Sequence, residues 1–150
     1  MRRRTFTAHW ILCLICAGSF WFAWGYGIPQ LVYASDASMM TSAIAAMVVG
    51  SAAWLGWQAW LAEDRAVVNG RLVAAASSDF GEEAQLLAPA LGMLGTVIGL
   101  SMQAKALVAG AAGLGALSTS LFTTGAGIAG FIVLKVMTLN LEAGIKRVTR

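Results

Sequence analysis

The stretch APALGMLGTVIGL, residues 88–100, contains three glycines and one proline among apolar residues, with Thr96 as its one hydroxyl side chain. In a water-soluble helix each interior glycine would cost about 1 kcal/mol relative to alanine, and the proline would cost more. In a membrane, small residues let neighbouring helices approach closely, and this packing compensates for the lost helix propensity. The stretch therefore indicates a membrane-embedded helix with a closely packed face.

The composition of the whole chain agrees with this interpretation. Of 150 residues, 59% are hydrophobic and 11% are charged, and the mean hydropathy is +0.75. A soluble domain has about a quarter of its residues charged, whereas a membrane span needs about 20 predominantly apolar residues. Because lipid offers backbone groups no alternative partner, such spans are helical. We predict an all-α polytopic protein, one membrane domain of residues 1–150, with four transmembrane helices at about residues 10–32, 39–61, 86–108 and 114–139.

The positions of the lysines and arginines predict the orientation of the chain. Most of them lie before the first span, in the connection 62–85 and after the last span. The other two connections contain none. Because short cytoplasmic loops are enriched in lysine and arginine, both termini and this connection are predicted to be cytoplasmic. The basic isoelectric point follows from this bias, so the expected surroundings are a lipid bilayer and not nucleic acid. The connection is too short for a catalytic domain, and we expect no enzyme activity, cofactor or metal.

Aromatic and sulfur-containing side chains fit the same map. Three tryptophans lie at the inner end of the second span, where they are expected to anchor the helix at the interface, although a binding stripe is an alternative: Trp54, Trp57 and Trp60. We expect His9 to be solvated at the inner interface, and Cys13 and Cys16 to pack as small apolar residues.

Two kinds of residue recur at helical spacing in the last two spans. The small residues predict helix-packing faces, and they include Gly92, Gly95, Gly99, Gly127 and Gly130. Polar residues overlap with these faces: Thr96, Gln103, Ser120, Thr123 and Thr124. The faces either serve packing alone, with hydroxyls bonded to the preceding turn, or they form a narrow polar track for an ion or for a partner's polar group.

The same two segments resemble the MotA/TolQ/ExbB proton-channel family. Its first signature, Ala-Pro followed by Gly-x-x-Gly-Thr-Val-x-Gly, matches Ala88, Pro89, Gly92, Gly95, Thr96, Val97 and Gly99. Its second signature is matched more loosely, by Ser120, Leu121, Thr124, Gly127, Ile128 and Asn140. The resemblance covers residues 88–140. Four spans with both termini inside are similar to the flagellar-stator branch of the family.

The resemblance implies a function for the chain. Members of this family form a homopentameric ring in the bacterial inner membrane, around two copies of a single-span partner similar to MotB, ExbD or TolR. The partner helix carries an aspartate that binds and releases the ion, either a proton or sodium. By analogy Thr96 and Thr124 would face this carboxylate, and Ser120, Thr123 and Gln103 would line the same path. Ion flow would then drive movement of the ring against its partner.

The acidic residues of this chain agree with an ion carrier on another chain. All lie outside the four predicted spans: Asp36, Glu63, Asp64, Asp79, Glu82, Glu83 and Glu142. A proton relay normally needs a titratable group inside the membrane. If this chain helps to conduct protons, the carboxylate must come from a partner.

Some residues depart from the family pattern and keep other functions open. Val133 stands where relatives often have a proline, and Lys135 lies near the inner end of the last span. The lysine would oppose cations on a pore face, or it snorkels to the headgroups. The alternatives are a non-conducting tetraspan scaffold and a phage-type lysis protein that forms pores alone. The short cytoplasmic connection argues against docking to a flagellar rotor.

Overall fold

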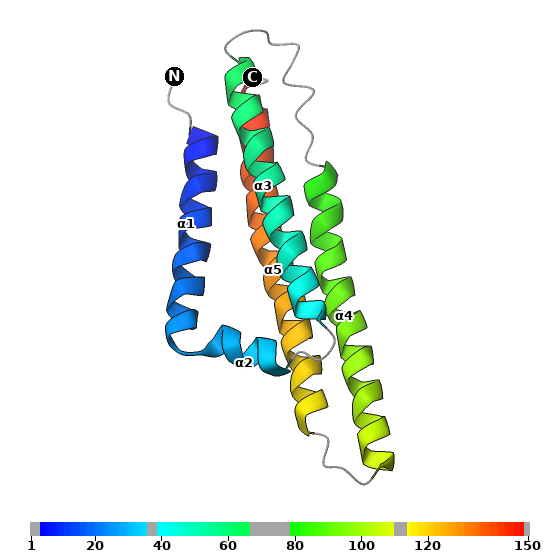
Figure 1. The fold of residues 1–150 in the computed structure, drawn as a ribbon. Coiled ribbons are helices and arrows are strands. Elements are labelled where there is room, and N and C mark those ends of the chain that lie inside the picture. The colour runs from blue at the N-terminus through cyan, green and yellow to red at the C-terminus, as the bar shows by residue number, and fades with distance from the viewer. Residues whose placement is uncertain (1–3, 36–38, 67–78, 110–113, 149–150) are drawn as a thin grey trace.

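The chain is described by a computed structural model over residues 4–35, 39–66, 79–109 and 114–148. These residues form helices and no strand, as the all-α prediction requires: α1 (Arg4–Gly25), α2 (Ile28–Ser35), α3 (Met40–Ala66), α4 (Asp79–Val108) and α5 (Leu114–Val148) (Figure 1). Within this part of the chain, four helices are long and apolar enough to cross a membrane, namely α1, α3, α4 and α5. The predicted class of multi-pass membrane protein is therefore supported.

The first predicted span, residues 10–32, is not one continuous helix. It begins earlier, at Arg4, and ends at Gly25, after which the short helix α2 runs across the bundle (Figure 1). Gly27 has a φ of 72° and its N–H donates to the Trp24 carbonyl at 3.0 Å. A glycine in the left-handed region closes helix ends readily, since it has no Cβ to clash. Pro29 then stands in the first turn of α2, where its missing N–H is tolerated.

The helices on the predicted cytoplasmic side are longer than the predicted spans. The connection 62–85 is helical at both ends, because α3 continues to Ala66 and α4 begins at Asp79; its middle, residues 67–78, lies outside the described residues. The carboxylates of Asp79 and Glu82 stand in the first turn of α4, where the helix dipole favours negative charge. At about 1.5 Å per residue, α5 is far longer than the roughly 30 Å of bilayer hydrocarbon, so it extends into water. Pro89 lies well inside α4, as its eleventh residue, because the helix begins at Asp79 and not at the predicted span boundary, residue 86.

The core of the molecule is a bundle of α3, α4 and α5. The contact between α4 and α5 is the most extensive one, and α3 packs against both helices (Figure 1). Buried apolar residues fill the three-helix interface towards the end where α5 terminates: Leu55, Ala59, Ala84, Leu134, Met137 and Leu141. The start of α1 is attached at the same end, where the Asn140 amide donates to the Thr5 carbonyl at 3.1 Å. The start of α1 and the end of α5 therefore lie at the same end of the bundle. This is what four membrane crossings require, because an even number of crossings returns the chain to the side where it began.

Glycines bring α4 and α5 into backbone contact. A Cβ added to Gly127 would lie 2.7 Å from the Ala88 carbonyl oxygen and 3.1 Å from the Gly92 Cα. A Cβ on Gly92 would lie 3.0 Å from the Thr123 carbonyl oxygen. Real Cβ atoms do not approach backbone this closely, so side chains at these positions would force the helices apart. The predicted packing role of Gly92 and Gly127 agrees with this geometry.

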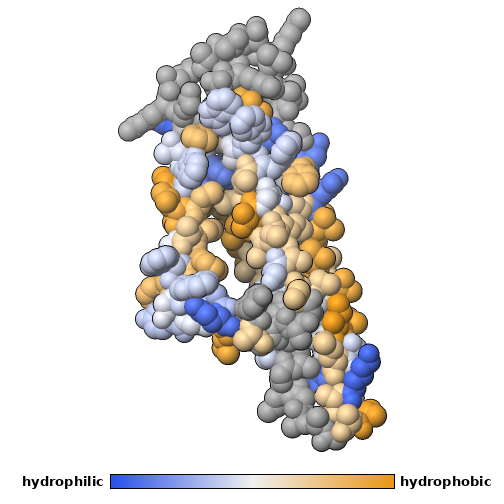
Figure 2. All heavy atoms as spheres, in the orientation of Figure 1, coloured by the Kyte–Doolittle hydropathy of each residue, from blue (hydrophilic) through white to orange (hydrophobic). Residues whose placement is uncertain are grey.

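Helix α1 stands away from the bundle between its two ends. A cavity of about 1010 Å³ lies between it and the helices α3 and α5, and Figure 2 shows the opening in the molecular surface. The space is open at its sides and its lining is almost entirely apolar, so in a membrane it is accessible to lipid.

A pair of glycine substitutions in α5 tests the close contact. Gly127→Ala should destabilise the protein by about 1–3 kcal/mol, because the new Cβ meets backbone atoms of α4 that cannot move alone. Gly125→Ala is the matched control, since nothing lies within 4 Å of its Cβ position. Both substitutions raise helix propensity, so the Gly125→Ala variant should be as stable as the unaltered chain or more stable. Reversible unfolding in lipid–detergent bicelles measures both. Equal stability of the two variants would contradict the contact.

Candidate functional site

A pair of threonines joins α4 and α5 at the middle of their contact. The hydroxyl oxygens of Thr96 and Thr124 form a hydrogen bond in which either can be the donor. The Thr96 hydroxyl is also 3.0 Å from the Gly92 carbonyl oxygen and 3.3 Å from that of Ser120, and the Thr124 hydroxyl is 2.9 Å from the same Ser120 oxygen. Because each hydroxyl has a single proton, it can donate to only one of these acceptors at a time. Rotation of the two O–H bonds can therefore change which oxygen donates and which accepts, while the heavy atoms stay in place. Both side chains are half-buried.

Glycines beside the pair explain how the two hydroxyls can meet. A Cβ on Gly95, next to Thr96, would lie 2.7 Å from the Thr123 Cβ and 2.8 Å from its hydroxyl oxygen. One turn away, a Cβ on Gly92 would lie 3.0 Å from the Thr123 carbonyl oxygen of α5. Any larger residue at either position would separate the helices beyond the reach of a threonine side chain. The short distance between the hydroxyls is therefore a consequence of the glycine face.

The other predicted polar residues are not part of this pair. The hydroxyl of Thr123, which is 0% exposed, donates to the Ser120 carbonyl at 3.1 Å. The buried Ser120 hydroxyl donates to the Leu117 carbonyl at 2.8 Å. These bonds run within α5, which is the arrangement expected for packing residues. Gln103 is half-buried further along α4, and within the described part of the chain no hydrogen bond links it to the threonine pair.

The remaining predicted packing glycines lie inside the bundle. Gly95 and Gly99 are buried in α4, and Gly130 is buried in α5. A Cβ on Gly130 would lie 2.8 Å from Val48 of α3 and 3.4 Å from the Cβ of Ala88. This glycine therefore lets α3 approach α5, which extends the small-residue packing from a pair of helices to three.

Four buried polar side chains were missed from the sequence, and each has an oxygen without a hydrogen-bond partner among the described residues. They belong to the buried faces of α3, α4 and α5: Ser51, Gln58, Gln85 and Thr138. The only sequence signal is their spacing, since Ser51 and Gln58 are seven residues apart on the face of α3 that buries Leu55. Buried oxygens that are left unpaired destabilise a fold, or they bind an internal water.

His9 is buried, and its expected solvation is wrong. Its side chain is 4% exposed and forms a hydrogen bond with the backbone of Ala52 in α3. The ring lies directly over Gly56, whose added Cβ would be 2.7 Å from the histidine Nε2. The absence of a side chain at Gly56 leaves room for the imidazole. His9 therefore helps to attach α1 to α3.

The hydrogen-bond partners of Thr96 and Thr124 in the described part of the chain include no charged side chain. Lys135 of α5 is exposed. In the ranges that the structure describes, no group of three or more histidine, cysteine, aspartate or glutamate side chains is placed to hold a metal ion. The arrangement can accept and donate hydrogen bonds, but it offers neither a nucleophile paired with a base nor a titratable group at the threonine pair.

Comparison of the chain with models of known families, with curated proteins and with solved structures gives no match. Its function is therefore inferred from the side chains described above.

The hydrogen bond between the two threonines can be measured with a double-mutant cycle. Thr96→Val and Thr124→Val each remove one hydroxyl while keeping the side-chain shape, and the double variant removes both. We expect a coupling free energy of about 0.6 kcal/mol, and at most about 1.7 kcal/mol, as for other hydrogen bonds between membrane helices. Unfolding in bicelles gives the four stabilities. Strict additivity of the two single changes would contradict the bond.

A second comparison tests the unpaired oxygen of Thr138. Thr138→Val should leave stability unchanged or raise it by up to about 3 kcal/mol, because it replaces an unpaired buried hydroxyl with a methyl group. Thr123→Val is the matched control: it is equally buried, but it removes a donor to the Ser120 carbonyl and should lower stability by about 0.5–1.5 kcal/mol. The same unfolding assay applies. An equal loss in both variants would mean that Thr138 has a partner, such as a bound water.

Proposed function

We propose that the chain is a ring-forming subunit of an ion-driven motor or energy-transducing complex in a bacterial inner membrane. The ring surrounds a single-span partner whose helix carries the aspartate that binds a proton or sodium ion. This chain supplies the hydroxyl groups that form hydrogen bonds with that carboxylate. The observation that supports the proposal is the Thr96–Thr124 hydroxyl pair, held at a glycine-lined contact between two membrane-spanning helices.

The chemistry of the pair suits a visiting carboxylate. Each threonine hydroxyl can donate or accept, and it has alternative acceptors in the Gly92 and Ser120 carbonyls. A protonated carboxylic acid could donate to one hydroxyl, and an ionised one could accept from both. Both threonines are half-buried, so part of each side chain is accessible from outside the contact between α4 and α5. They are within reach of a helix placed alongside α4 and α5.

Exposed apolar side chains provide a surface for such neighbours. On α5, Leu121 and Ile128 flank Thr124 at one helical turn on either side and are 65% and 51% exposed. On α4, Val97 directly follows Thr96 and is 64% exposed. In a ring, copies of the chain and the partner helix would cover this surface. Apolar side chains can equally well contact lipid. Their exposure therefore supports a ring only when it is taken together with the hydroxyl pair.

The position of the acidic groups supports a carrier on another chain. On α4 the acidic side chains lie in the first two turns, and on α5 Glu142 lies near the end of the helix. Each of them is at least 13 residues along its helix from Thr96 or Thr124. Since a relay needs a titratable group within the membrane, the proposed partner must bring it.

A non-conducting scaffold is the second candidate. Thr96 and Thr124 already satisfy one another within the chain, which is what a purely structural contact needs. Lys135 follows Thr124 by eleven residues, about three helical turns, and so shares its face of α5. A cation on that face would repel ions that approach the pair. A scaffold would keep the packing and lose conduction.

The proposal is tested with the complex purified from native membranes and reconstituted in vesicles that contain dyes for protons and sodium. Native mass spectrometry should give five copies of the chain with a single-span protein that has an aspartate in its span. Thr124→Val should abolish ion flux while the assembly keeps its mass. Thr124→Ser should retain flux, because the hydroxyl is preserved.

Thr138→Val is the matched control for this experiment, since it removes a hydroxyl from the same helix outside the pair. Its flux should equal that of the unaltered chain. Normal flux in Thr124→Val would overturn the role of the pair. An intact assembly that conducts neither ion would favour the scaffold, and a monomer without a partner would exclude the ring.

A further inference from the structure

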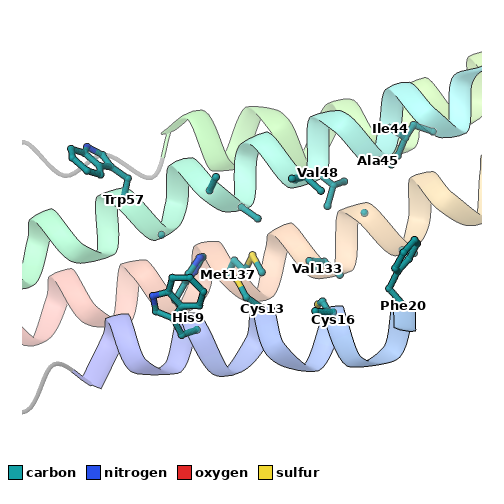
Figure 3. A pocket seen from close by; sticks show the side chains of 18 of the residues that line it. His9, Cys13, Cys16, Phe20, Ile44, Ala45, Val48, Trp57, Val133 and Met137 are labelled. Carbon is teal, nitrogen blue, oxygen red and sulfur yellow. The ribbon is translucent and has the colours of Figure 1, made fainter. Parts of the chain in front are cut away.

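The cavity beside α1 lies between three membrane-spanning helices and is open at its sides. Its walls include His9, Cys13 and Phe20 of α1, Ile44 and Val48 of α3, and Val133 of α5. Figure 3 shows the labelled α1 side chains pointing towards α5, which carries Val133, while Ile44 and Val48 lie on α3. The volume of about 1010 Å³ is at the upper end of the roughly 300–1,000 Å³ typical of ligand pockets.

The lining determines what can occupy this space. Almost all of the lining side chains are apolar, and His9 is already bonded to the backbone of Ala52. A water cluster would find too few polar partners along these walls, because buried water normally makes two to four hydrogen bonds. The occupant is therefore apolar over most of its length. In the hydrocarbon layer, the most abundant such molecules are phospholipid acyl chains.

The shape of the cavity favours acyl chains over a helix. The start of α1 is attached to α5 by the Asn140–Thr5 hydrogen bond, and α2 continues from its other end and contacts α5. The opening is thus closed at both ends, as Figure 2 shows. A helix is about 10–12 Å wide with its side chains and would have to be threaded through this opening. Flexible acyl chains can enter from the side.

The charges at one end of the cavity indicate the headgroup. Arg4 is exposed at the start of α1, and Lys146 and Arg147 are exposed in the last turn of α5, about two turns beyond the Asn140 side chain that joins the two helices.

The acidic residues at this end are Glu142 of α5 and, in the last turn of α3, Glu63 and Asp64, which Arg65 follows. The acidic first turn of α4, with Asp79 and Glu82, lies on the opposite side of α3 and α5 from α1 (Figure 1). On the α1 and α5 side of this end, three exposed basic residues therefore face one half-buried acidic residue. Basic pockets between membrane helices bind anionic headgroups.

Aromatic rings mark the same end of the cavity. Trp10, Trp57 and Trp60 line it close to His9. Such rings prefer the boundary between hydrocarbon and headgroups. They place this mouth at the depth where a glycerol backbone and its phosphate would lie, so the polar and apolar parts of a phospholipid both meet suitable surroundings.

We propose that the cavity between α1 and the helices α3 and α5 binds an anionic phospholipid. Its acyl chains fill the apolar space, and its phosphate lies at Arg4 and Arg147. The bound lipid takes the place of a packing helix and supports the second half of α1, because the contacts of α1 with the bundle lie in its first half, at Thr5, His9, Leu12 and Cys13. The site is separate from the threonine pair and does not require ion conduction.

The test uses the full chain in liposomes that contain a photoactivatable phospholipid with a diazirine in its acyl chain. One sample has a phosphatidylglycerol probe and the other a phosphatidylcholine probe with the same chain. Peptide mapping should place the label on the lining segments, residues 6–20, 41–57 and 126–137. Labelling by the anionic probe should be stronger, and Arg4→Gln should reduce this preference by about fivefold, the effect of one basic group at an anionic surface.

Two neighbouring alanines of α3 give the matched variants. Ala45 lines the cavity, whereas Ala46 is exposed but does not line it. Ala45→Phe should remove most of the labelling of residues 6–20, and Ala46→Phe should leave it unchanged. If Ala45→Phe does not yield folded protein, Ala53→Phe fills another part of the same cavity and should have the same effect. Monodispersity on gel filtration confirms that each variant is folded.

Three results would overturn the proposal. Equal labelling in the Ala45→Phe and Ala46→Phe variants would show that the probe does not enter the cavity. Labelling of the cavity without preference for phosphatidylglycerol would exclude an anionic ligand. A cross-link from Cys16 to a second copy of the chain or to another protein would show that a protein segment occupies the space.

Discussion

The rest of the bundle depends on the backbone contact between α4 and α5. Gly127 is so close to the Ala88 carbonyl that a methyl group there would lie 2.7 Å from the oxygen. Lipid provides no hydrophobic drive that would favour helix association, so van der Waals contact over small residues must hold the pair together. The same contact reaches α3, because Gly130 leaves room for Val48. The close packing thus compensates for the low helix propensity of the glycines.

The chemistry of the candidate site follows from that contact. Two threonine hydroxyls on neighbouring helices can bond directly only when the backbones are nearly touching, and Gly92 and Gly95 provide this condition. Packing and function are therefore not separate interpretations of these residues. The glycine face that a scaffold would need also places two hydroxyls together at the contact between α4 and α5. A scaffold and an ion-conducting ring would therefore share this contact and would differ in the helix that lies beside it.

Helix α1 is related to the bundle in a different way. It is joined to α3 by His9 over Gly56 and to α5 by Asn140, and Leu12 and Cys13 pack against the core. A large apolar space lies beside it. In water such a space would collapse or be unstable, but in a membrane it can be filled by the solvent itself. A bound lipid would then be a structural component, with a headgroup selected by the basic end of the bundle.

The sequence by itself determined the class of the protein, the approximate position of its spans and the glycine face. Hydropathy and residue spacing report directly on lipid exposure and on helical faces, and the hairpin limits at Val108 and Leu114 coincide with the observed helix ends. Only the tertiary structure decided that Thr96 meets Thr124 while Thr123 and Ser120 bond along their own helix. It also decided that His9 is buried and that α1 ends at Gly25. These features depend on how one helix is rotated and placed against another, and a pattern along a single helix does not contain that information.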